Sequence, residues 1–212
     1  MKLLHIDSSI TGAASASRQL TARIIEALQK TVPGAKLIYR DLEAEPLPHL
    51  DSKMLAGMAS DAATDATTQN ELGRSLSALD EFLQADVIVI GAPMYNFAIS
   101  SQLKAWIDRI AVAGKTFTYT AEGPKGLAGG KKVIIASSRG GAYPPGTAHG
   151  ALDFQETYLR TVLRFLGIED VQVIRAEGIA MGPEQREAAL QKAFEAIATL
   201  AASSPAPTVK AA

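Results

Sequence analysis

The sequence contains no cysteine among its 212 residues. This absence excludes thiol nucleophiles, iron–sulfur clusters and zinc sites that depend on cysteine, and it is typical of a protein from a reducing compartment. Any chemistry must therefore use a bound cofactor or side chains with oxygen and nitrogen atoms. A chain of this length buries roughly 70% of its unfolded surface, so we expect one domain with a full core.

Net charge is also nearly absent, because 21 Lys and Arg residues almost balance 22 Asp and Glu residues and leave a formal charge of -1. Binding to nucleic acid or to an acidic membrane through the overall field needs a cationic excess, so we expect neither partner. Long apolar runs are missing too, since runs such as Val87 to Ile90 are far shorter than the ~20 residues that span a bilayer. His5 and Asp7 follow Met1 too closely for a signal peptide, and we expect a cytoplasmic protein.

Several motifs of known chemistry are absent as well. The three histidines, His5, His49 and His149, do not have the spacing of metal ligands, so no metal site is expected. The chain has no Gly-x-Ser-x-Gly elbow of the kind found in serine hydrolases. The first loop has only Gly12 where the dinucleotide fingerprint needs three glycines, and the glycine-rich residues 126–132 precede a strand, whereas a triphosphate-binding loop follows one.

The sequence does contain a regular alternation of short apolar runs with segments of helical period. Five runs are predicted strands: Lys2 to Asp7, Lys36 to Asp41, Asp86 to Gly91, Lys131 to Ser137 and Asp170 to Glu177. Apolar residues at steps of three and four predict helices around residues 20–28, 103–110, 154–165 and 190–201, with Gly114 and Gly167 ending two of them and Pro183 beginning the last. The alternation predicts an α/β fold with a doubly wound sheet of five parallel strands and helices on both faces. We take 2-1-3-4-5, a common order for such sheets, as the expected strand order.

We assign residues 1–202 to a single domain with one irregular insertion. The stretch 46–68 is longer than an ordinary connection and includes Met54 and Leu55. It is either a loose helical insertion on the surface or an arm that covers a partner subunit or the mouth of a site, since such side chains need a surface to bury them. Residues 203–212 are rich in Ser, Pro and Ala, which predicts a disordered tail.

Three loops follow the carboxyl ends of predicted strands, where ligands of open parallel sheets bind. The first is dense in hydroxyl groups and enters a helix at Ser17 or Arg18. Ser9, Ser15 and Ser17, together with the free N–H groups of the helix N-terminus, predict a phosphate site. The alternative is that Ser17 only caps the helix.

The second and third loops have the composition of a site for a flat ring. Tyr95 and Phe97 supply apolar surface and Asn96 supplies an amide, although the aromatic residues could instead belong to the core. Gly140 and Gly141 let a ligand approach backbone N–H groups closely, although paired glycines are also common in turns. In the predicted strand order the three loops are neighbours, so we expect one crevice for a phosphate and a ring.

Five segments follow one another along the chain: the serine-rich first loop, Pro93 to Phe97, Leu103 to Arg109, Gly114 to Tyr119 and Ser138 to Gly141. In this order they resemble the FMN-dependent NAD(P)H azoreductases, the azoreductase type 1 family of flavodoxin-like quinone reductases. The resemblance extends from the first strand to about Pro183. It implies the flavodoxin-like form of the predicted fold and a homodimer that holds one FMN per subunit near the subunit interface.

The resemblance also assigns residues to the cofactor. Those expected to hold the FMN phosphate are Ser9, Ser15, Ala16 and Ser17, of which Ala16 offers only its backbone N–H. Those expected to hold the ring are Met94, Tyr95, Asn96 and Phe97 on one side, and Ser138, Arg139, Gly140 and Gly141 on the other. Tyr119 is a candidate for the substrate pocket, with a core role as its alternative.

The resemblance implies an oxidoreductase that transfers two electrons in a ping-pong cycle. NADH or NADPH reduces FMN and leaves, and a quinone, an azo compound or a nitroaromatic then takes the two electrons. Because the flavin carries this chemistry, no catalytic side chain is expected. Two other functions stay open: a flavodoxin-type single-electron carrier, which would normally have a strongly acidic surface, and a flavin-free binding module.

Overall fold

The computed structural model describes residues 1–59 and 65–203. One sheet consists of the parallel strands β1 (Lys2–Asp7), β2 (Lys36–Asp41), β3 (Val87–Pro93), β6 (Lys132–Ser138) and β7 (Asp170–Ala176). Their order is β2-β1-β3-β6-β7, which confirms the predicted order of the five strands. Each strand boundary lies within two residues of its predicted position. The tail predicted for residues 203–212 lies outside the described residues, except for Ser203.

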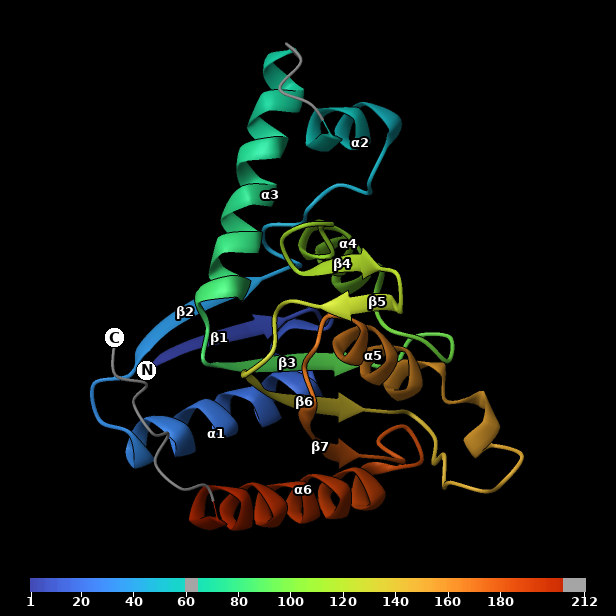
Figure 1. Cartoon of the computed structure of the whole chain (residues 1–212). Coiled ribbons are helices and arrows are strands. Elements are labelled where there is room, and N and C mark those ends of the chain that lie inside the picture. The colour runs from blue at the N-terminus through green and yellow to red at the C-terminus, as the bar shows by residue number, and fades with distance from the viewer. Residues whose placement is uncertain (60–64, 204–212) are drawn as a thin grey trace.

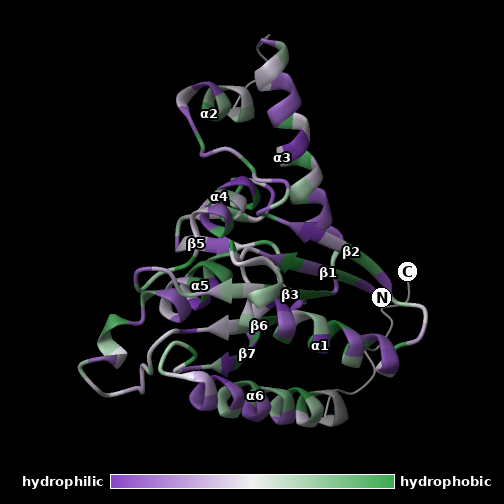
Figure 2. Ribbon diagram, turned by 180° about the vertical axis from the view of Figure 1, so that it is seen from behind, coloured by the Kyte–Doolittle hydropathy of each residue, from purple (hydrophilic) through white to green (hydrophobic). Residues whose placement is uncertain are grey.

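Helices cover both faces of the sheet because its strands are apolar on both sides. They are α1 (Ala16–Thr31), α2 (Ser52–Ala59), α3 (Ala66–Gln84), α4 (Ser101–Ile110), α5 (Phe154–Phe165) and α6 (Pro183–Ser203). Helices α1 and α6 lie on one face, where they pack on Leu3 and Val89 (Figure 1). Helices α3, α4 and α5 lie on the other face, over Leu4 and Ile88. Figure 2 shows that α1 and α6 carry both hydrophilic and hydrophobic residues, as expected of helices with one buried side.

The helix ends have identifiable caps. The side chains that cap α1, α3, α4 and α5, each by accepting a hydrogen bond from the N–H three residues ahead, are Ser15, Asp65, Ser100 and Asp153. Gly167 follows α5 with a φ of 91°, and Pro183 begins α6, so both predictions are confirmed. The prediction for Gly114 is wrong, because α4 ends at Ile110 and the N–H of Gly114 closes a turn by donating to Phe117.

A small antiparallel hairpin, β4 (Phe117–Thr120) and β5 (Gly123–Gly126), was not predicted. It is separate from the main sheet and packs on α5, where the ring centroids of Phe117 and Phe165 are 4.6 Å apart. Gly126 lies so close to Gly167 that a Cβ on Gly126 would be 2.1 Å from the backbone nitrogen of Gly167. A four-residue strand with two glycines and a proline has no alternating pattern, so hydrophobic periodicity could not reveal it.

The predicted insertion at 46–68 includes α2 and the first turn of α3, with residues 60–64 outside the described part. Helix α2 lies beside the end of α3 that projects beyond the sheet (Figure 1). Met54 is buried, whereas Leu55 is 59% exposed. Buried Arg109 fixes the base of the insertion, since its guanidinium donates to the carbonyl oxygen of Pro48 at 2.6 Å and to the hydroxyl of Ser75 at 3.1 Å. A role as a cover for a partner or a site remains a prediction.

Candidate functional site

Three loops lie next to one another at the carboxyl edge of the sheet, toward which the strand arrows point in Figure 1. We call residues 8–17 the serine loop, residues 94–98 the aromatic loop and residues 138–143 the glycine loop. The hydroxyl oxygens of Ser9 and Tyr95 are 3.2 Å apart and join the first two loops. The N–H of Met94 donates to the carbonyl oxygen of Ser138 at 2.8 Å and joins the second to the third. The structure therefore brings together the three loops that the sequence singled out.

The serine loop offers hydrogen-bond donors at the N-terminus of α1. The hydroxyl oxygens of Ser15 and Ser17 are 3.1 Å apart, and both residues are buried. In the part of the chain that the structure describes, the backbone N–H groups of Ala16 and Ser17 have no acceptor. Free N–H groups and the partial positive charge of a helix start are the recognised requirements of an anion site, so these residues fit a phosphate group.

The start of α1 differs by one or two residues from the prediction, which placed it at Ser17 or Arg18. The helix begins at Ala16, and its cap is Ser15, whose Oγ accepts a hydrogen bond from the N–H of Arg18 at 3.2 Å. The capping role considered for Ser17 therefore belongs to Ser15. Ser17 is fully buried, and its hydroxyl lies within hydrogen-bond distance of the Ser15 hydroxyl, so it can orient that cap.

The aromatic loop is a tight turn in an uncommon conformation. Tyr95 and Ala98 exchange two backbone hydrogen bonds of 2.9 and 3.0 Å across the turn. Asn96 and Phe97 have φ values of 49° and 70°, and among the described residues no other non-glycine residue has a positive φ. The turn leaves the Phe97 side chain 44% exposed, with its ring edge-on to Tyr143 at 6.4 Å. Phe97 is therefore not a core residue, the alternative considered for the aromatic residues.

The glycine loop leaves two backbone donors free. The carbonyl oxygens of Arg139, Gly140 and Gly141 accept hydrogen bonds of 2.9–3.1 Å from the N–H groups of residues 178–180. Within the described residues, the N–H groups of Gly140 and Gly141 have no acceptor. One edge of the loop is thus fully bonded, and its other edge can donate to a ligand. Residues 178–180 were not predicted to take part, because a support made of backbone atoms leaves no residue signature.

Arg139 was expected to hold the ring, but the contacts of its side chain point away from such a role. The guanidinium is buried and forms ion pairs with Asp153 at 2.8 Å, Glu156 at 3.1 Å and Glu177 at 3.2 Å. Burial disfavours the charge of Glu156, but hydrogen bonds from two further arginines outweigh it and hold the pKa of this carboxyl below its ordinary value. The Arg139 side chain therefore ties the loop to α5 and to the end of β7, and only its backbone belongs to the loop surface.

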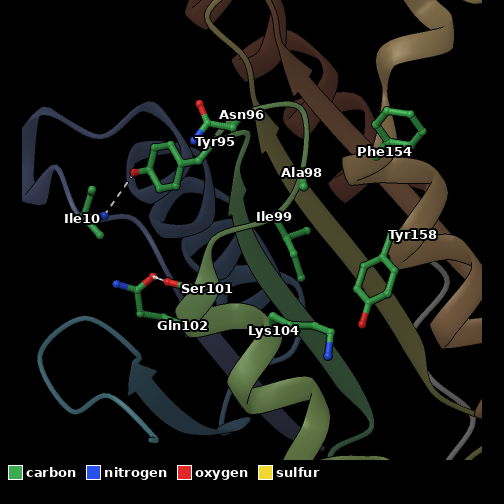
Figure 3. A pocket seen from close by; sticks show the side chains of 10 residues that line it. All are labelled: Ile10, Tyr95, Asn96, Ala98, Ile99, Ser101, Gln102, Lys104, Phe154 and Tyr158. Atoms are coloured by element: carbon green, nitrogen blue, oxygen red, sulfur yellow. Dashed lines mark hydrogen bonds between the residues drawn. The ribbon is translucent and has the colours of Figure 1, made fainter. Parts of the chain in front are cut away.

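An open groove lies on one side of the aromatic loop, between the serine loop, α4 and α5. Its volume is about 610 Å³, and its lining residues are Ile10, Tyr95, Asn96, Ala98, Ile99, Ser101, Gln102, Lys104, Phe154 and Tyr158 (Figure 3). The groove includes Tyr95 and Asn96 of the predicted ring site, but not Ser15, Gly140 or Gly141. It is mainly apolar, and burial raises the pKa of the Tyr158 phenol.

Tyr119 lies on the β4–β5 hairpin. Its side chain is 72% exposed, and its ring packs edge-on against Phe117 with 5.6 Å between centroids. Its exposure rules out the core role considered as the alternative. A role in the substrate pocket remains a prediction.

Two polar residues at the site were not predicted. Arg18, in the first turn of α1, donates hydrogen bonds to the carbonyl oxygen of Ser9 and to the carboxylate of Asp41 at the end of β2. The sequence carries little signal for this contact, because an arginine in a first helical turn is equally compatible with solvent.

Among residues 1–59 and 65–203, no group of three or more His, Asp or Glu side chains could hold a metal ion. Within the same ranges no helix combines the length and apolar character that a membrane span requires.

The fold and the three loops define a doubly wound α/β protein with a candidate ligand site at the carboxyl edge of its sheet. A family model described as flavodoxin-like fold matches residues 1–201, and the chain belongs to this family. It is 58% identical to the FMN-dependent NADH:quinone oxidoreductase of Methylocella silvestris over 203 residues, which are 95% of this chain and all of the relative. It is 57% identical to the protein of the same name from Ralstonia nicotianae, over 93% of this chain and 95% of the relative.

Solved structures agree with these relatives. The FMN-dependent NADH-azoreductase from Bacillus anthracis, determined in complex with FMN, superimposes with a TM-score of 0.86 at 26% identity, covering 95% of this chain and 97% of the other. A second azoreductase structure from Bacillus anthracis gives the same TM-score at 27% identity and covers 95% of this chain and 98% of the other. The similarity therefore extends over the whole described fold.

Proposed function

We propose that this chain is an FMN-dependent oxidoreductase that transfers two electrons from NADH or NADPH to quinones and azo compounds. The observation that carries the proposal is the junction of the three loops. It places the free N–H groups at the start of α1 and the free N–H groups of Gly140 and Gly141 on loops that are bonded to one another. A phosphate and a polar ring edge need these two sets of donors. The names of the relatives supply the reaction class.

Bound FMN supplies the hydride chemistry, so the chain needs no nucleophile or catalytic acid of its own. Its residues bind, orient and exclude water. The N-terminus of α1 compensates the charge of the phosphate. The N–H groups of Gly140 and Gly141, held by residues 178–180, can stabilise negative charge on a ring without reorganising. The rings of Phe97 and Tyr143, which meet edge-on at 6.4 Å, offer apolar surface where the aromatic loop contacts the glycine loop.

We also propose a homodimer formed through the groove beside the aromatic loop. Two large apolar side chains that line this groove are exposed, Ile10 at 54% and Phe154 at 57%. Phe97, whose carbonyl oxygen accepts the N–H of Phe154, lies beside the groove and is 44% exposed. A contiguous exposed apolar surface is typical of a protein interface. We further propose that residues 1–202 form one domain. The enzyme is then cytoplasmic, because this compartment holds NAD(P)H. Nitroaromatics are further candidate acceptors, because they also present flat rings.

An absorbance spectrum of the purified protein tests the class. We expect flavin bands, present on purification or after addition of FMN, that bleach when NADH is added without oxygen. A protein that takes up no FMN would instead be a flavin-free binding module. Anaerobic bleaching followed by reoxidation with menadione or methyl red, with no other protein present, distinguishes the reductase from a single-electron carrier. Parallel double-reciprocal plots would support the two-step cycle, and intersecting lines would contradict it.

A further inference from the structure

Arg18 links the serine loop to the edge strand β2. Its guanidinium holds the carbonyl oxygen of Ser9 with two hydrogen bonds, from Nε at 3.3 Å and from Nη2 at 2.9 Å. The same group binds the Asp41 carboxylate with Nη1 at 2.6 Å and Nη2 at 2.8 Å. The side chain of Arg18 is only 17% exposed. This planar, two-sided arrangement uses the fork geometry that distinguishes arginine from lysine.

The acceptor on the far side of Arg18 is itself fixed. The Asp41 carboxylate also accepts the N–H groups of Glu43 at 3.0 Å and of Ala44 at 3.3 Å in the turn after β2. The hydrogen bond from Arg18, helped by these N–H groups, lowers the pKa of Asp41 to about 2. The pair is therefore fully charged at neutral pH and holds Arg18 in one orientation.

Ser9, the residue that Arg18 holds, is restrained from both ends. Arg18 fixes its carbonyl group, and its hydroxyl lies 3.0 Å from the hydroxyl of Thr11 and 3.2 Å from that of Tyr95. Ser9 is buried, so it has little freedom to adopt another arrangement. The path of the serine loop in front of the α1 N-terminus is thus set by a chain of contacts from Asp41 through Arg18 to Ser9.

Arg18 could in principle bind a phosphate directly, since it lies in the first turn of the helix. The observed contacts oppose this role, because the guanidinium would have to leave an ion pair with Asp41 in which both carboxylate oxygens are engaged. We propose instead that Arg18 is a positioning residue that shapes the serine loop for the phosphate group, so that the site selects FMN over riboflavin. This inference rests on the proposed function, since it assumes that FMN binds here.

Arg40→Lys provides a matched control for Arg18→Lys. Arg40 lies on β2 and forms a comparable two-pronged pair with Glu81, at 2.8 and 2.7 Å, with a side chain that is 13% exposed. Within the described residues, no hydrogen bond or ion pair of Arg40 reaches the serine loop. Both substitutions replace a guanidinium fork with a single ammonium group, but only Arg18→Lys loosens the hold on Ser9.

The experiment measures dissociation constants of FMN and of riboflavin for the flavin-free proteins, by quenching of flavin fluorescence, with melting temperatures recorded in parallel. We expect Arg18→Lys to weaken FMN binding about tenfold and riboflavin binding less than twofold. Arg40→Lys should leave both constants within twofold. Asp41→Asn, which keeps Arg18 but weakens its anchor, should lower FMN affinity in the same selective way and serves if Arg18→Lys does not fold.

Equal losses of FMN and riboflavin affinity in Arg18→Lys would overturn the inference, because a purely structural defect affects both ligands. Unchanged FMN affinity, or an equal effect of Arg40→Lys, would overturn it as well. If the unmodified protein binds neither flavin, the proposed function fails and this inference fails with it. An unmodified protein that binds FMN, together with an unaffected Arg18→Lys variant, refutes the positioning role alone.

Discussion

The hydroxyl oxygens of Ser9 and Tyr95 lie 3.2 Å apart, and the same Tyr95 oxygen accepts a hydrogen bond from the N–H of Ile10 at 3.2 Å. One phenol therefore connects the serine loop to the aromatic loop. The two loops follow neighbouring strands, and this phenol bonds one loop to the other. A ligand that spans a phosphate site and a ring site depends on the distance between them, which this contact fixes.

Removal of the Tyr95 hydroxyl should therefore affect binding more than folding. We expect Tyr95→Phe to reduce the free energy of unfolding by about 1 kcal/mol, because one shared hydroxyl is lost. FMN affinity should fall about fivefold or more, as the two loops lose their fixed separation. Fluorescence titration and urea unfolding of the flavin-free protein measure the two quantities. A variant that loses stability but keeps full FMN affinity would show that the connection is structural only.

Ser15 and Ser17 should differ in their effects when each is replaced by alanine. Ser15→Ala removes the cap of α1 and should cost about 1 kcal/mol of stability as well as FMN affinity. Ser17→Ala leaves the cap in place and removes the hydroxyl that orients it, so FMN affinity should fall with a smaller loss of stability. Together the two substitutions should weaken FMN retention strongly while the fold persists.

Ser100→Ala is the control for this pair. Ser100 caps α4 in the same way, with its Oγ accepting from the N–H of Leu103 at 3.2 Å, and it lies outside the serine loop. It should lose a similar amount of stability with unchanged FMN affinity. If Ser100→Ala and Ser15→Ala reduce FMN binding equally, the phosphate site does not lie at the start of α1.

The protein should become more stable when Phe97 is replaced by glycine. The φ of 70° at this position costs a non-glycine residue about 1–2 kcal/mol, whereas glycine adopts this region freely at an entropic cost of about 0.5–1 kcal/mol. The free energy of unfolding of Phe97→Gly should therefore rise by about 0.5 kcal/mol. FMN affinity should fall, because the exposed ring is lost. A clear loss of stability in denaturant unfolding would mean that contacts of the phenyl ring outweigh the strain.

The main sheet could be predicted from the sequence because each strand is an apolar run bounded by polar or glycine-containing segments, and the strand order then placed the three loops together. The unusual turn of the aromatic loop could not be predicted in this way. Asn96 is a residue that accepts a positive φ, but Phe97 stands where the common turn signal has glycine. The contact of Arg18 with Asp41 was equally hidden, because it depends on how β2 lies beside β1 and leaves no pattern in spacing. Side-chain contacts between distant segments become visible only when the fold is known.

The Asp41 carboxylate should make stability depend on pH in the acid range. Its pKa is about 2 in the folded protein, below the ordinary value of 3.8, because of the hydrogen bond from Arg18 first and the N–H groups of Glu43 and Ala44 next. A lowered pKa contributes stability above the unfolded value, and that contribution is lost as the pH falls from about 4 toward 2. Between pH 5 and pH 2, unmodified protein should lose about 2 kcal/mol more than Asp41→Asn in urea unfolding. Parallel pH profiles for the two proteins would contradict this assignment.

The contact between Gly126 and Gly167 should make the β4–β5 hairpin intolerant of any side chain at residue 126. A Cβ there would lie 2.1 Å from the nitrogen of Gly167 and 2.3 Å from the carbonyl carbon of Leu166, and backbone atoms at the end of a helix cannot move aside easily. Gly126→Ala should therefore lower the free energy of unfolding by about 3 kcal/mol, as overpacking does. Gly73→Ala is the control, because Gly73 lies within α3 with nothing within 4 Å of the added Cβ, and it should gain about 1 kcal/mol from helix propensity. Denaturant unfolding of both variants measures the difference. Equal stability of the two variants would show that the hairpin can separate from α5 without cost.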